Sequence, residues 1–154
     1  ILHGLLGMNH ALRADSRART APDMLNRALE KVLRLAPHDV LVVIVSDFFG
    51  VDARSEQLTA RIAAHNDILG VLVHDPVRLD PARTNISVSD GTLQMPLDLA
   101  SRKIREVIAD DYRAEQQRIT QFLRKLSAPL LMISNEGDVV DQVRRLLGMP
   151  ARGA

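Results

Sequence analysis

The stretch Val40-Leu41-Val42-Val43-Ile44-Val45-Ser46-Asp47 decides the fold of this chain. Its first six residues are aliphatic and mostly β-branched, which is typical of a strand covered on both faces in a parallel sheet. Similar runs over residues 68–73 and 129–134 predict two further strands of the same kind. We therefore expect an α/β domain whose centre is the strand Leu41 to Val45, with Ser46-Asp47 at its carboxyl end.

Helical patterns separate these apolar runs. A helix is expected after Thr20, a good N-cap residue, and Pro37 ends it. Strands that alternate with helices imply right-handed crossovers in a parallel sheet. The pair Asp90-Gly91, between two short strand-like runs, predicts a β-hairpin. Helices are also predicted over residues 1–12, 55–65, 101–126 and 139–147, the third with an inward face of Ile104, Val107, Ile108, Ile119, Phe122, Leu123 and Leu126.

Composition narrows the class of protein. The 154 residues suffice for one domain, and a net charge of +1 sets up no field for nucleic acid or an anionic membrane. Aromatic residues are 3% of the chain, which argues against a base-stacking surface. There is no cysteine, which excludes disulfides and thiolate metal sites and fits a reducing compartment, so we expect a cytoplasmic protein. No apolar run approaches the ~18 residues of a membrane span.

The first residues of the sequence resemble the interior of a longer chain. Ile1 enters directly into an apolar pattern without a preceding basic region, so it does not resemble a signal peptide. Three parallel strands are few for such a sheet, and we expect further strands upstream. Their absence would leave the strand Leu41 to Val45 as an exposed edge, and such edges pair with other chains. We predict a homo-oligomer formed through that edge.

Polar side chains follow each predicted strand, at Ser46-Asp47, His74-Asp75 and Ser134-Asn135-Glu136. Ligands of open α/β sheets bind beyond the carboxyl ends of the strands. Asp47 and Asp75 carry the hard oxygen atoms that Mg²⁺ prefers, and Thr20 carries a hydroxyl. Each also has a purely structural explanation: Thr20 as an N-cap, Asp47 in an Asx turn, and Asp75 as a turn residue before Pro76. Glycine-rich phosphate loops and a nucleophile elbow are absent.

Two further features are not expected to take part in chemistry or binding. His74 is expected to be exposed or hydrogen-bonded rather than catalytic. The charged face of the helix over residues 101–126, which includes Glu115, mixes both signs and is expected to face solvent.

The stretches Thr20-Ala-Pro-Asp-Met-Leu-Asn-Arg-Ala-Leu and Leu41-Val-Val-Ile-Val-Ser-Asp-Phe-Phe resemble the second half of a von Willebrand factor A-type domain. More narrowly, they resemble the bacterial family called domain of unknown function fifty-eight. The segments Ala64 to Pro76, Val88 to Gly91 and Leu97 to Leu99 agree with that layout, so the resemblance covers nearly the whole chain. It implies one partial domain over residues 1–154: a Rossmann-like, three-layer, mainly parallel sheet with helices on both faces, a small hairpin insertion, and its N-terminal strands missing.

The resemblance also implies a function. Such domains hold a divalent cation at a metal-ion-dependent adhesion site, and Thr20 and Asp47 match two of its ligands. The Asp-x-Ser-x-Ser loop that supplies the main ligands is not in this sequence, and its usual place lies before Ile1. Mg²⁺ would then bind the intact protein, and we expect none to bind this incomplete site. Arg78 stands where the family tends to have Glu.

A partner's acidic side chain fills the open coordination position in such sites. The preferred interpretation is therefore a non-enzymatic protein-interaction module, whose partner the resemblance suggests to be a MoxR-type AAA+ ATPase. Two alternatives stay open. One is a Mg²⁺-dependent phosphoryl hydrolase that uses Asp47 and Asp75, and the other is a purely structural domain of a larger envelope-linked protein.

Overall fold

The computed structural model of the chain describes residues 23–79, 85–89 and 94–150. The predicted helix over residues 1–12, Thr20 and the turn Asp90-Gly91 lie outside them. The elements are α2 (Met24–Leu35), β1 (Leu41–Ser46), α3 (Ala53–Ala63), β2 (Asp67–His74), the 3₁₀ turn η1 (Pro76–Arg78), β3 (Asn85–Ser89), β4 (Gln94–Asp98), α4 (Arg102–Lys125), β5 (Leu130–Ser134) and α5 (Val139–Leu146).

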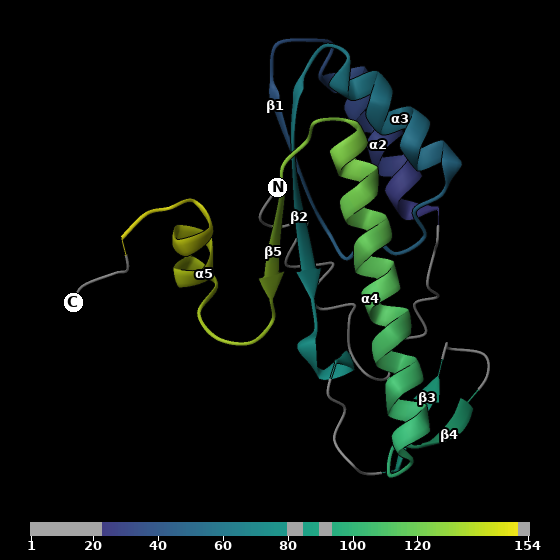
Figure 1. Cartoon of the computed structure of the whole chain (residues 1–154). Helices are drawn as coiled ribbons and strands as arrows, with labels where there is room; N and C mark the ends of the chain where they lie inside the picture. Colours follow the sequence, from purple (N-terminus) through teal and green to yellow (C-terminus); the bar gives the residue numbers. More distant parts are fainter. Residues whose placement is uncertain (1–22, 80–84, 90–93, 151–154) are drawn as a thin grey trace, which may run out of the picture.

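The sheet has the order β1-β2-β5, and both strand pairs are parallel. Figure 1 shows α2, α3 and α4 on one side of this sheet and α5 on the other, against β5. The predicted hairpin is present as the antiparallel pair β3-β4, beside the N-terminal end of α4 (Figure 1). The predictions of an α/β domain, a parallel sheet and a hairpin insertion are therefore confirmed.

The core lies between the sheet and the three helices on one side of it. Val42 of β1 and Leu72 of β2 face these helices, and Ile62 of α3 and Leu123 of α4 are fully buried against them. Gly70 of β2 lets α4 approach closely, since a Cβ at that position would clash with Cδ1 of Leu123. The position of α4 over β2 thus depends on a residue without a side chain.

The expectation that β1 is covered on both faces is wrong for the described residues. Val42 is buried, but Leu41, Val43 and Val45 have 61%, 49% and 64% of their surface exposed. These three side chains point to the other face of the sheet, where α5 contacts β5 rather than β1. Within the described ranges β1 is also an edge strand, as the sequence predicts.

Helix α2 begins at Met24 with Asp23 in the N-cap position, and the predicted N-cap Thr20 lies outside the described residues. One prediction about α4 is wrong. Val107 was expected to face inward but is 61% exposed, whereas Tyr112 is buried. Five residues separate the two, about 140° around a helix of 3.6 residues per turn, so both cannot face the sheet.

Candidate functional site

The carboxyl ends of the three parallel strands meet beside α4 and form one concavity. We call it the carboxyl-end hollow; it has a volume of about 300 Å³ and opens at one end of the sheet. The strand register explains the convergence, since Ser46 pairs with Leu72 and His74 pairs with Ser134. The hollow is lined by Asp47, Leu72, Val73, His74, Asp75, Tyr112, Glu115, Gln116, Ile119 and Asn135.

Asp47 follows β1 in a tight turn. Its Oδ1 accepts a hydrogen bond from the N–H of Phe49 at 3.0 Å, and Oγ of Ser46 accepts one from the N–H of Phe48 at 2.9 Å. Phe48 has a φ of 56°, in the left-handed region, while its side chain is buried in the core. The predicted Asx turn is therefore present. It holds an exposed carboxylate whose Oδ2 accepts no hydrogen bond from the described residues.

Asp75 occupies the corresponding place after β2. Its Oδ1 accepts a hydrogen bond from the N–H of Val77 at 3.0 Å and so caps η1, with Pro76 at the first position. The predicted role as a turn residue is confirmed. Next to it, the N–H of Asn135 donates to the carbonyl of His74 at 3.1 Å, which ties the end of β5 to the end of β2. The structure thus brings Asp47, Asp75 and Asn135 to one rim.

His74 does not match the expectation of an exposed or hydrogen-bonded histidine. Its Nδ1 is buried and has no hydrogen-bond partner among the described residues. The imidazole lies beside the ring of Tyr112, with 6.3 Å between centroids and an interplanar angle of 41°. The Tyr112 hydroxyl accepts a hydrogen bond from Nε2 of Gln116 at 2.9 Å.

Helix α4 closes the hollow with side chains that were not predicted to belong to a site. Glu115 was expected on a solvent-facing charged surface, yet it lines the hollow together with Tyr112 and Gln116. The signal was available in the spacing, because residues 112, 115, 116 and 119 lie on one face of a helix. The mixed charges of the neighbouring positions instead suggested a surface that faces solvent.

A polar network fixes the loop that carries Asp47. Asp52 caps α3: the N–H of Ser55 donates to its Oδ1 at 2.8 Å, and Nδ2 of Asn26 on α2 donates to the same oxygen at 3.1 Å. Oγ of Ser55 donates to Oδ1 of the buried Asn26 at 2.7 Å. The backbone hydrogen bond from Ser55, followed by that from Asn26, lowers the pKa of Asp52 below its usual value. The network thereby joins α2 and α3 at the end of the β1–α3 loop.

The predicted metal ligands are only partly described. Asp47 offers a carboxylate oxygen of the kind Mg²⁺ prefers, and Thr20 lies outside the described residues. Asp75 shares the hollow with Asp47, as the hydrolase alternative requires. Within the described ranges, no three His, Asp or Glu side chains are grouped as a metal ion would need.

The described helices include none that is both long enough and apolar enough to cross a membrane. No family model, no curated protein and no solved structure matches the chain.

Proposed function

We propose that this chain is a non-enzymatic protein-interaction module that docks its partner at the carboxyl end of the sheet. The observation that carries the proposal is the hydrogen-bonded turn that presents Asp47. Its carboxylate is held by a hydrogen-bonded turn that the buried side chain of Phe48 anchors in the core. Phe49 follows with half of its surface exposed, and aromatic side chains are enriched in protein interfaces.

The resemblance to von Willebrand factor A-type domains extends this proposal. In the intact domain Thr20 and Asp47 would bind Mg²⁺ together with ligands from upstream, and an acidic side chain of the partner would complete the coordination. The partner would be a MoxR-type AAA+ ATPase. The place of Asp47 at the carboxyl end of β1 supports this, because ligands of open α/β sheets bind there.

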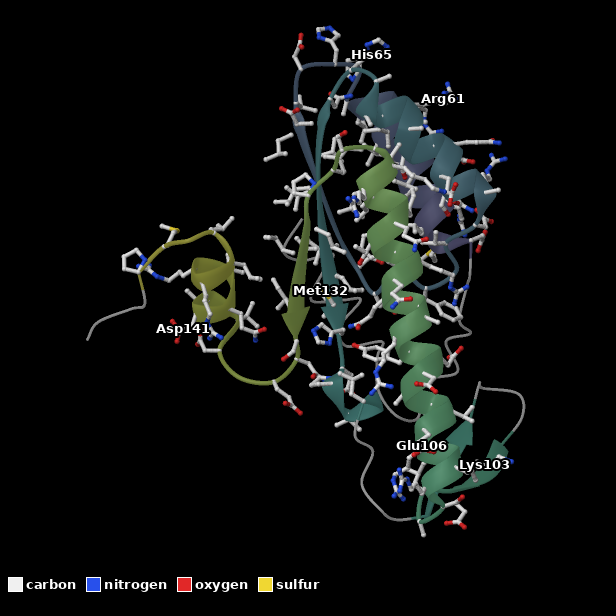
Figure 2. All side chains as sticks on the ribbon, in the orientation of Figure 1. Arg61, His65, Lys103, Glu106, Met132 and Asp141 are labelled. Atoms are coloured by element: carbon white, nitrogen blue, oxygen red, sulfur yellow. The ribbon has the colours of Figure 1, made fainter. Side chains whose placement is uncertain are left out.

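Calorimetry tests the docking proposal. The chain, expressed with its native upstream residues, is titrated with a MoxR-type ATPase from the same organism, with Mg²⁺ and with a chelator. We expect Asp47→Asn to weaken binding at least about tenfold, the effect of losing one charged contact. Asp141→Asn is the matched control, since Asp141 lies on α5, across the sheet from α4 (Figure 2). Equal binding by Asp47→Asn and the unmodified chain would refute the proposal.

A second candidate is a Mg²⁺-dependent phosphoryl hydrolase. The shared lining of one hollow by Asp47, His74 and Asp75 is the observation that favours it. Turnover of p-nitrophenyl phosphate that requires Mg²⁺, is lost in Asp47→Asn and is retained in Asp141→Asn would establish this function. The absence of any such turnover would leave the docking function as the better explanation of the hollow.

We also propose that a second copy of the chain pairs with β1. In the part of the chain that the structure describes, one backbone edge of β1 has no neighbouring strand, and Leu41, Val43 and Val45 add an apolar strip beside that edge. Strand addition would satisfy the free N–H and C=O groups and bury the apolar side chains in one step.

A further inference from the structure

One face of the sheet is only partly covered by the described residues. In one row of register partners, Val45 of β1 is 64% exposed, whereas Val71 beside it on β2 is 8% exposed. On the same face Ile133 of β5 is also buried, and α5 contacts β5 from this side (Figure 1). The cover that α5 supplies therefore ends at β2, and β1 receives none from the described residues.

The uncovered strip has the size of one further helix. Neighbouring strands are about 4.8 Å apart, and a helix with its side chains is about 10–12 Å across, so one helix covers about two strands. With α5 over β5 and β2, a second helix fits beside it over β1. The six residues of β1 span about 20 Å, the length of a helix of about 13 residues.

The first twelve residues of the sequence match this strip in length and chemistry. They lie outside the described residues, and their sequence predicts a helix about 18 Å long. Ile1, Leu5 and Leu12 recur at the spacing of one helix face, and His3 and His10 fall on the opposite face. The segment contains no Asp, Glu, Lys or Arg, so packing it on an apolar strip buries no charge.

The chain enters α2 at a point from which this face can be reached. Nδ2 of Asn26, in the first turn of α2, donates to Asp52 at the end of the loop after β1, so α2 begins near the carboxyl end of the edge strand. The layers on the two sides of a sheet are about 20 Å apart, at about 10 Å for each packed layer. Residues 13–22 span up to about 33 Å when extended, which is enough to pass around β1.

We propose that the exposed face of β1 is the docking surface of the chain's own N-terminal segment, residues 1–12. The segment packs as a helix on Leu41, Val43 and Val45, beside α5. The proposal concerns the face of β1, so it is independent of docking at Asp47 and of strand pairing at the backbone edge.

Cross-linking in the full chain tests the proposal, and the lack of cysteine in the sequence gives a clean background. Leu5→Cys is combined with Val43→Cys and treated with a short bismaleimide at low protein concentration. We expect a link within one chain in most molecules. The matched control combines Leu5→Cys with Val107→Cys and should give no such link, because Val107 is a similarly exposed valine of α4, on the opposite side of the sheet (Figure 1).

The mass of the products distinguishes the possible occupants. Links that join two chains in the Leu5→Cys/Val43→Cys variant, but in neither single variant, would show that the segment of a second copy covers the strip. That outcome overturns the proposal. So does an equal yield in the control pair, or the absence of any link, which would leave the strip to a different occupant.

Urea unfolding gives a second readout that needs no cysteine. Leu5→Gln should lower the equilibrium constant for folding at least about tenfold, the effect of removing one leucine from an apolar contact. His10→Gln, on the opposite face of the segment, is the matched control and should leave the midpoint unchanged. Equal midpoints for the two variants, or a loss that depends on protein concentration, would contradict packing of the segment on its own chain.

Discussion

Replacing Gly70 by alanine tests the packing of α4 on β2, which closes one side of the hollow. The added Cβ would clash with Cδ1 of Leu123 and lie 3.3 Å from Cδ1 of Leu130. Because Leu123 is fully buried, its side chain has no free space into which to turn. Overpacking of this kind costs about 1–3 kcal/mol. Gly70 has no positive φ, so the lower entropy of the unfolded alanine chain returns about 0.4–1 kcal/mol.

We therefore expect Gly70→Ala to lower the free energy of unfolding by about 1–2 kcal/mol. Leu123→Ala alone should cost about 2–5 kcal/mol, because it leaves a cavity. In the double variant the methyl group of Ala at position 70 enters that cavity instead of clashing. The double loss should thus be smaller than the sum of the two single losses by about 1–3 kcal/mol.

Urea unfolding followed by far-UV circular dichroism gives the four free energies of this cycle. Val107→Ala, at an exposed position of the same helix, is the control and should change stability by less than about 0.5 kcal/mol. If Gly70→Ala is at least as stable as the unmodified chain, or if its cost persists unchanged beside Leu123→Ala, then α4 does not pack on β2 as described.

Two further predictions concern the loop and the sheet edge. The lowered pKa of Asp52 means that its ionised form stabilises the fold above the usual carboxyl value of 3.8 and that this contribution is lost as the pH falls through the lowered value. The urea midpoint should therefore fall more steeply in acid for the unmodified chain than for Asp52→Asn, and parallel acid limbs would contradict this. Val43→Lys should convert the proposed oligomer to a monomer in light scattering, while Val107→Lys should leave it assembled; a monomeric unmodified chain would rule out pairing through β1.

Local patterns predicted the elements of the described residues well. The bounds of β1, β2 and β5 lie within one or two residues of the aliphatic runs, because side-chain type and spacing decide where a strand forms. The hairpin of β3 and β4 followed from its short flanking runs in the same way. The ends of the strands then placed Asp47, Asp75 and Asn135 at one edge, as parallel topology requires.

Such local patterns do not predict contacts between residues that are far apart in the sequence. Asn26 can occupy a buried position of α2 because it forms hydrogen bonds with Asp52 and Ser55. These partners come 26 and 29 residues later in the chain, and no residue near Asn26 indicates them. The spacing Asp52-x-x-Ser55 was visible as a capping box and was missed. The exposed face of β1 was not predicted either, since a continuous apolar run favours a strand covered on both faces, whereas one face of β1 is exposed among the described residues.

In the turn after β1, backbone conformation and side-chain burial have opposite effects on stability at Phe48. A phenylalanine in the left-handed region is strained by about 1–2 kcal/mol, and the burial of its ring in the core offsets that strain. Phe48→Ala and Phe48→Gly remove the same ring, so their difference isolates the backbone. Glycine is ordinarily the less stable of the two by about 0.5–1 kcal/mol, yet here it should be the more stable by a similar amount, since it adopts a φ of 56° without strain. If Phe48→Ala unfolds at the higher urea concentration, Phe48 does not adopt the strained left-handed conformation, and the turn that holds Asp47 differs from the one described.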